Sequence, residues 1–186
     1  MYASAGKRVY RDLQQHIDEL KARDLLYVVD EPVNKDTEMS ALVRWQFRGG
    51  LREDQRKAFL FTNPTDSKGR QYDIPVVIGA LAANQDIYAT GMDTTVDGIA
   101  AKWSHAIANP VPPRVVEDAP CHDVVVDGED LLAEDGGLVR LPVPLSTPGF
   151  DSTPTLAATN VITKNPDTGT QNMGTYRAGL KSSDRL

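Results

Sequence analysis

Apolar residues recur at helical spacing near the start of the chain. Leu13, Ile17 and Leu20 are three or four positions apart and are separated by charged and amide side chains, which predicts a helix over residues 10–23. The segment 25–30 follows at once, is rich in β-branched residues and is followed by a Glu-Pro pair, so we expect a strand there. The chain therefore opens with a helix–strand unit.

The same alternation continues for about eighty more residues. Asn34 or Asp36 is expected to cap a second helix that Gly49-Gly50 ends. Trp45 and Trp103 fall on predicted helices, with their rings expected to pack on a sheet. Further strands are expected at 58–62 and 74–78, and further helices at 84–90 and 95–108. Alternating helices and strands predict an N-terminal α/β domain over residues 1–115.

The pattern changes after a proline cluster at residues 110–120. From there on we expect no helix. Segment 141–145 should be extended, and strand-like runs at 121–126, 156–164 and 171–181 are separated by Gly, Pro and Asp. The sequence thus predicts a second, β-rich domain over residues 116–186. One or two hairpins leave unpaired edges and half a core, so this domain is expected to be incomplete.

Composition and charge exclude several classes of protein. The chain is 40% hydrophobic and 25% charged, and its formal net charge of −6 comes without a Lys/Arg cluster. This argues against nucleic acid or an anionic membrane as the main partner. No apolar stretch is long enough to span a bilayer, and the single cysteine, Cys121, forms no internal disulfide, so a cytoplasmic location is expected. The glycine-rich dinucleotide, P-loop, zinc-hydrolase and serine-hydrolase signatures are absent.

One segment near the end of the chain carries candidate chemistry. Asn172, Gly174, Tyr176 and Arg177 lie close together on the predicted returning strand of a hairpin. An amide oxygen is a hard ligand suited to Mg²⁺ or Mn²⁺, and glycine permits close backbone approach to a bulky ligand. The arginine fork can hold a carboxylate or phosphate with two parallel hydrogen bonds. A plain hairpin without a site would explain the same pattern.

This hairpin resembles the most specific segment of the UbiD-type decarboxylases. It reads Val161-Ile-Thr-Lys-Asn-Pro-Asp-Thr-Gly169, followed by Asn172-Met-Gly-Thr-Tyr-Arg177. Four weaker likenesses occur in the same order as in the family: the opening helix Asp12–Leu20, the strand Leu25–Val33, the strand Phe59–Pro64 and the linker Leu141–Pro144. The resemblance covers essentially the whole chain.

The resemblance implies a fold and a set of cofactors. Family members have an N-terminal α/β domain, a flavin-binding split β-barrel and a C-terminal region used in oligomerisation. The chain would then be α+β overall, with an α/β domain followed by the start of the barrel. The implied cofactors are prenylated FMN, Mn²⁺ (or Mg²⁺) and K⁺. The implied partners are a flavin prenyltransferase that supplies the cofactor and further copies of the chain in a homo-oligomer.

The resemblance also implies roles for individual residues. Asn172 would be a metal ligand, Asn172, Thr175, Tyr176 and Arg177 would bind the cofactor, and Arg177 would be catalytic. The expected activity is non-oxidative release of CO₂ from an aromatic or α,β-unsaturated carboxylic acid. The remaining metal ligands and both catalytic carboxylates are expected beyond Leu186, so the 186 residues alone are expected to be inactive.

Two other functions remain open from the sequence. The chain could be a non-catalytic assembly subunit of a multi-chain carboxylase, or a plain flavin-binding module. The substrate, the physiological direction of the reaction and the oligomeric state are left open as well.

Overall fold

The computed structural model describes residues 12–112 and 114–186. They form two compact units that interleave along the chain. The first unit holds the segments up to residue 31, 42–62 and 76–120, and the second holds the segments 32–41, 63–75 and 121–186. A division into contiguous domains at residue 115 stays a prediction.

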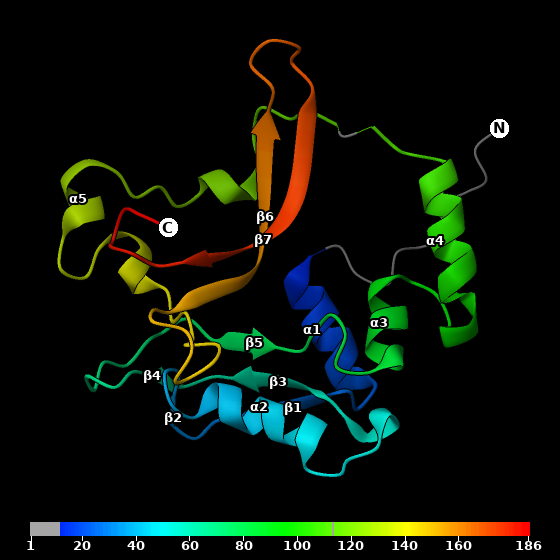
Figure 1. The fold of residues 1–186 in the computed structure, drawn as a ribbon, viewed down its shortest axis with the longest axis horizontal. Coiled ribbons are helices and arrows are strands. Elements are labelled where there is room, and N and C mark those ends of the chain that lie inside the picture. Colours follow the sequence, from blue (N-terminus) through cyan, green and yellow to red (C-terminus); the bar gives the residue numbers. More distant parts are fainter. Residues whose placement is uncertain (1–11, 113) are drawn as a thin grey trace. The chain divides into compact units, whose positions relative to one another are not determined.

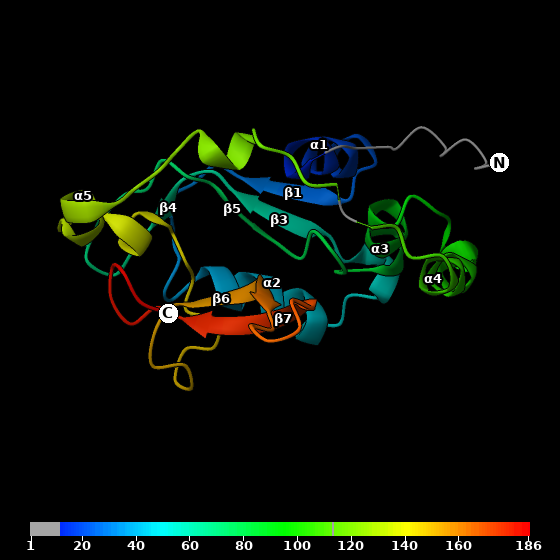
Figure 2. The same ribbon diagram turned by 90° about the horizontal axis from the view of Figure 1, so that it is seen from above.

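A mixed three-stranded sheet is the centre of the first unit. Its strands are β1 (Leu26–Val29), β3 (Ala58–Phe61) and β5 (Val76–Ile78), in the order β1-β3-β5. β1 pairs with β3 in parallel, and β3 pairs with β5 antiparallel. Helix α1 (Leu13–Ala22) packs on one face of this sheet and α2 (Met39–Arg48) lies across the other (Figures 1 and 2). These strands and helices confirm the predicted elements; residues 10 and 11 of the first helix lie outside the described residues.

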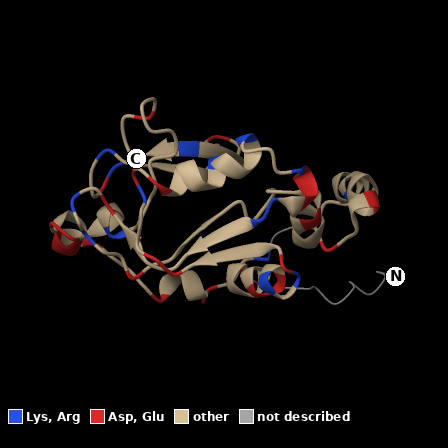
Figure 3. Cartoon of the chain, turned by 90° about the horizontal axis from the view of Figure 1, so that it is seen from below, with Lys and Arg blue, Asp and Glu red and all other residues tan. Residues whose placement is uncertain are grey.

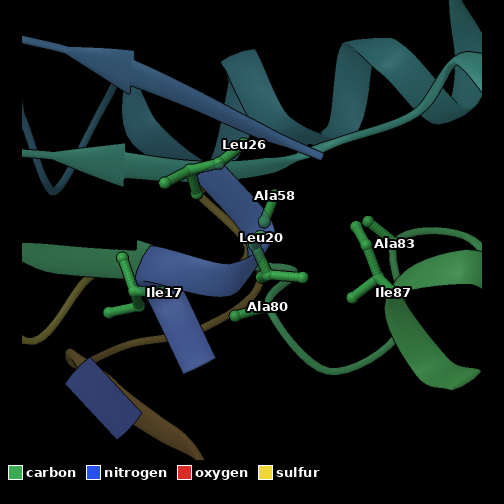
Figure 4. Packing of buried hydrophobic residues seen from close by; sticks show 7 residues of the cluster. All are labelled: Ile17, Leu20, Leu26, Ala58, Ala80, Ala83 and Ile87. Atoms are coloured by element: carbon green, nitrogen blue, oxygen red, sulfur yellow. The ribbon is translucent and has the colours of Figure 1, made fainter. Parts of the chain in front are cut away.

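The hydrophobic core of this unit lies between α1 and the sheet. Leu20 is fully buried and Ile17 is 8% exposed, and both belong to a cluster with residues of β1, β3 and the segment around α3 (Gln85–Gly91) (Figure 4). The other members of the cluster are Leu26, Ala58, Ala80, Ala83 and Ile87. The i, i+3 spacing of Ile17 and Leu20 thus places both side chains on the buried face of the helix.

The two tryptophans do not pack on the sheet, so that prediction was wrong. The Trp45 side chain is 72% exposed. Trp103 lies on α4 (Ile99–Ala108), is 49% exposed and donates its indole N–H to the hydroxyl of Tyr88 on α3 at 2.7 Å. A tryptophan carries a polar N–H, and here that group is satisfied by a neighbouring helix at the surface.

The second unit begins with a two-stranded parallel pair, β2 (Val33–Asn34) and β4 (Pro64–Thr65). The Asn34 side chain accepts hydrogen bonds from the backbone N–H groups of Asp36 and Thr37, at 2.9 and 3.2 Å. Asn34, one of the two predicted caps, therefore caps the turn that leads into α2, and the helix itself begins at Met39. Its short side chain reaches only two or three residues ahead.

The second unit contains a buried lysine with polar and aromatic neighbours. Lys35 is 5% exposed, and its ammonium lies 2.6 Å from the Asp36 carboxylate and above the ring of Tyr72. The Tyr72 hydroxyl donates to Asp66 at 3.1 Å. Burial, together with the negative charge of Asp66, raises the pKa of Tyr72 to about 12. The charge of Lys35 is thus buried only together with a carboxylate partner.

Three short helices occupy the region where no helix was expected. They are the 3₁₀ helices Pro120–His122 and Gly137–Arg140 and the α-helix α5 (Gly128–Leu132). The predicted strand at 121–126 is absent from the described residues. Gly128 adopts a φ of +54° after the extended Asp127, so this Asp-Gly pair starts a helix instead of ending a strand.

A long antiparallel hairpin closes the chain. β6 (Thr155–Lys164) pairs with β7 (Gln171–Gly179), and the turn between them is held by Asn165, whose side chain accepts from two backbone N–H groups. This confirms the predicted strands and turn. Among the described residues the two strands pair only with each other, so no closed barrel is formed. The fold is a mixture of helices and sheets.

Lys/Arg and Asp/Glu residues are interspersed along the described residues (Figure 3). Over residues 12–112 and 114–186, no helix has both the length and the apolar character needed to cross a bilayer.

Candidate functional site

The four predicted site residues lie on β7, but not on one face of it. Successive side chains of a strand point to opposite sides, so Asn172 and Tyr176 share a face with Gly174, while Thr175 and Arg177 project from the other face. Asn172 and Arg177 are about 17 Å apart along the strand. The strand therefore presents an amide at one end and a guanidinium at the other.

Gly174 leaves room for a ring on the first of these faces. A Cβ atom built at Gly174 would lie 3.0 Å from Cζ and from the hydroxyl of Tyr176, so the tyrosine ring lies over the glycine. Any larger residue at this position would displace that ring. The Tyr176 ring thus covers the backbone at Gly174, and a flat ligand on this face would meet the ring.

Arg177 forms a charged contact with a residue outside the hairpin strands. Its Nη2 donates to both carboxylate oxygens of Asp151, at 2.9 and 3.0 Å. Asp151 lies at the end of a turn in which its N–H donates to the carbonyl of Thr147 at 2.9 Å. On the same face of β7 the hydroxyl of Thr175 donates to Asn160 at 3.2 Å. This second face thus carries an arginine already paired with a carboxylate.

The ion pair changes the acidity of Asp151. The hydrogen bond from Arg177 holds the pKa of the Asp151 carboxyl below its usual value of 3.8. A carboxyl whose pKa is lowered on folding stabilises the fold above its unfolded pKa, and this stabilisation is lost as the pH falls through the lowered value. The ion pair is therefore complete at neutral pH.

We predict that Arg177→Gln raises the pKa of Asp151. The titration of the Asp151 carboxyl carbon, followed by ¹³C NMR, should have its midpoint below 3.8 in the wild type and a higher midpoint in the variant. Arg185→Gln is the control, because Arg185 is paired with Asp184 instead. Equal Asp151 midpoints in the wild type and Arg177→Gln would contradict the ion pair.

The described residues do not make up a metal centre. In the part of the chain that the structure covers, no group of three or more His, Cys, Asp and Glu side chains is arranged to hold a metal ion. Asn172 is exposed and could contribute one amide oxygen. Further ligands would be needed to complete a metal site around it.

The hairpin has three large apolar or aromatic side chains that are mostly exposed. Ile162 and Met173, which face each other across the two strands, are 63% and 64% exposed, and Tyr176 is 57% exposed. A two-stranded ribbon with both faces exposed is marginally stable in water. These side chains are therefore suited to contact a ligand or further protein.

Sequence reasoning missed Asp151. The residue precedes β6 by four positions, and the register pairs Thr155, the first residue of β6, with Gly179, the last residue of β7. Continued past Thr155, this register would place Asp151 opposite residue 183 and not Arg177. No local pattern in the sequence therefore identifies Asp151.

Comparison with known proteins assigns both parts of the chain. Residues 17–107 match the family model of the 3-octaprenyl-4-hydroxybenzoate carboxy-lyase N-terminal domain. Residues 114–186 match the model of the 3-octaprenyl-4-hydroxybenzoate carboxy-lyase Rift-related domain. Together the two matches cover most of the chain.

Solved structures give the same assignment. The UbiD-class enzyme HmfF from Pelotomaculum thermopropionicum, in complex with FMN, is 27% identical with a TM-score of 0.73, over 92% of this chain and 35% of that chain. An evolved dimeric form of HmfF in complex with prFMN is 27% identical with a TM-score of 0.70, over 92% and 36%. The apo 3,4-dihydroxybenzoic acid decarboxylase from Enterobacter cloacae is 25% identical with a TM-score of 0.75, over 92% and 35%.

The chain spans about a third of the length of these structures. The likeness nevertheless runs through both family models and almost all of the residues in the sequence. This chain belongs to the UbiD family of carboxy-lyases.

Proposed function

We propose that this chain is the N-terminal part of a prenylated-FMN-dependent (de)carboxylase that acts on an aromatic or α,β-unsaturated carboxylic acid. The observation that carries the proposal is β7, an exposed strand that bears Asn172, Gly174, Tyr176 and Arg177. Its place within a family match that extends to residue 186 supports the proposal, as does the binding of FMN and prFMN by the similar HmfF structures.

The proposed architecture has two parts. Residues 1–115 form the α/β domain, and residues 116–186 begin a split β-barrel that binds the flavin. The unpaired outer edges of β6 and β7 and the exposed Ile162 and Met173 support this, because further strands would pair the edges and cover the side chains. In this arrangement one face of β7 is turned towards the flavin.

In the proposed site the positive charge of Arg177 pairs with the negative charge of the substrate carboxylate. Its guanidinium binds the substrate carboxylate through parallel N–H donors and holds the bond to the leaving CO₂ in a fixed direction. The same positive charge lowers the pKa of any carboxyl group placed beside it, as it does for Asp151. When bound, prenylated FMN supplies the electron sink that accommodates the charge left when CO₂ departs.

The other three residues hold the cofactor. Thr175 and Tyr176 line it, largely through the backbone of β7. Asn172 would supply one amide oxygen to a Mn²⁺ (or Mg²⁺) ion, and K⁺ would be a second ion of the site. The proton donor and the other metal ligands would come from outside these residues, so the 186 residues alone would release no CO₂.

The test is to assay the intact protein and the 186-residue chain, each loaded with prenylated FMN or ordinary FMN. CO₂ release is measured over a panel of aromatic, heteroaromatic and α,β-unsaturated acids. We expect release only by the intact protein with prenylated FMN. Binding of ordinary FMN, with no release of CO₂ after loading with prenylated FMN, would instead identify a flavin-binding module. Failure to bind either flavin, with tight association with a second UbiD-type chain, would identify an assembly subunit.

A further inference from the structure

Asp151 contacts only one end of the Arg177 guanidinium. Both hydrogen bonds of the ion pair use Nη2, at 2.9 and 3.0 Å from the two carboxylate oxygens. A guanidinium has five N–H donors in a rigid plane. Nη1 is therefore not used by Asp151, and its N–H groups can meet a second anion in the same plane.

The carboxylate is held more firmly than the arginine it binds. The Asp151 side chain is 17% exposed, against 57% for Arg177. The backbone around Asp151 is tied in place on both sides, because its own N–H donates to the carbonyl of Thr147 and the N–H of Leu180 donates to the carbonyl of Pro154, each at 2.9 Å. A long arginine side chain has many rotamers, so a fixed partner selects among them.

We propose that Asp151 is a positioning residue for Arg177. It holds Nη2 so that Nη1 faces the substrate carboxylate, and it offsets part of the positive charge. The identity of that carboxylate rests on the proposed function; the orienting contact does not. Without Asp151 the arginine keeps its charge but not its direction, so a carboxylate binds more tightly and in unproductive orientations.

The first test observes Arg177 directly, without any assay of activity. ¹⁵N-arginine NMR of the intact protein, with Arg177→Lys used to assign the signal, reports rotation about the Cζ–Nη2 bond. We expect slow rotation in the wild type, fast rotation in Asp151→Asn and an intermediate rate in Asp151→Glu. The matched control is Asp167→Asn, which removes one exposed negative charge in the hairpin turn. An Arg177 signal that is unchanged in Asp151→Asn would overturn the proposal.

The second test separates orientation from stability. With benzoate as the probe, Asp151→Asn should bind about threefold more tightly than the wild type, because a neighbouring negative charge is gone. With prenylated FMN and a substrate that the wild type accepts, kcat should fall about tenfold while KM also falls. A merely structural role would lower the active fraction and leave KM and benzoate affinity unchanged, and that result would overturn the proposal.

The two proposals fail in different ways. If the wild type loaded with prenylated FMN releases no CO₂ from any acid, the proposed function is wrong. The NMR signal of Arg177 and the affinity for benzoate then still decide the role of Asp151.

Discussion

Replacing Arg177 with alanine is expected to lower kcat/KM for CO₂ release by about a hundredfold or more, the usual cost of removing a donor that stabilises developing charge. The variant loses both the positive charge and the planar fork that would orient the substrate carboxylate. Arg177→Lys keeps the charge without the fork, so we expect a smaller loss, about tenfold. The measurement is the initial rate of CO₂ release by the intact protein loaded with prenylated FMN.

A suitable control, Arg185, lies eight residues after Arg177 in the same unit. Arg185 is exposed and forms only a long contact with Asp184, at 3.7 Å. Arg185→Ala should therefore leave kcat/KM within a factor of two or so of the wild type, since exposed ion pairs of this kind contribute little. An equal loss in both variants would show that arginine removal disturbs the unit as a whole, and no loss in Arg177→Ala would contradict the catalytic assignment.

The largest effect on stability is expected for Leu20→Ala. Leu20 is fully buried between α1 and the sheet, in the cluster that includes Ile17, Leu26 and Ile87. Removing its branched side chain loses buried apolar surface and leaves a cavity, which together lower the free energy of unfolding by about 3–5 kcal/mol. Urea denaturation measures this difference.

The matched control is Leu13→Ala, on the same helix. Leu13 is 56% exposed, and alanine is a good helix former, so the free energy of unfolding should change by less than about 0.5 kcal/mol. If both variants unfolded at the same urea concentration, the burial of Leu20 between α1 and the sheet would be wrong.

Local patterns in the sequence predicted most of the helices and strands. The spacing of Leu13, Ile17 and Leu20 indicated the helix, and Ile17 and Leu20 share its buried face, whereas Leu13 is exposed. The turn at Asn165–Gly169 was equally local, because Asn165 bonds to N–H groups two and three residues ahead. Short-range hydrogen bonds of this kind need no tertiary contact.

The short helices between residues 120 and 140 were not predicted from the sequence. α5 has five residues, which is fewer than two turns, so it shows no helical period that a pattern could reveal. Its Asp127-Gly128 start resembles a hairpin turn in the sequence, and the extended backbone of Asp127, where a type I′ turn needs a positive φ, distinguishes the two. Trp45 and Trp103 were also misplaced, because the periodicity indicates which residues share a face but not whether that face is covered.

The sequence by itself determined the composition of the candidate site: Asn172, Gly174, Tyr176 and Arg177 lie within six consecutive positions, and strand alternation then assigns their faces. Only the tertiary structure decided what Arg177 contacts. Asp151 is 26 residues away in the chain, and its approach depends on the register of β6 and β7, including the irregularity between Leu156 and Thr159. A one-residue change of register would move the pairing, so this contact follows from how the strands are joined and not from any local pattern.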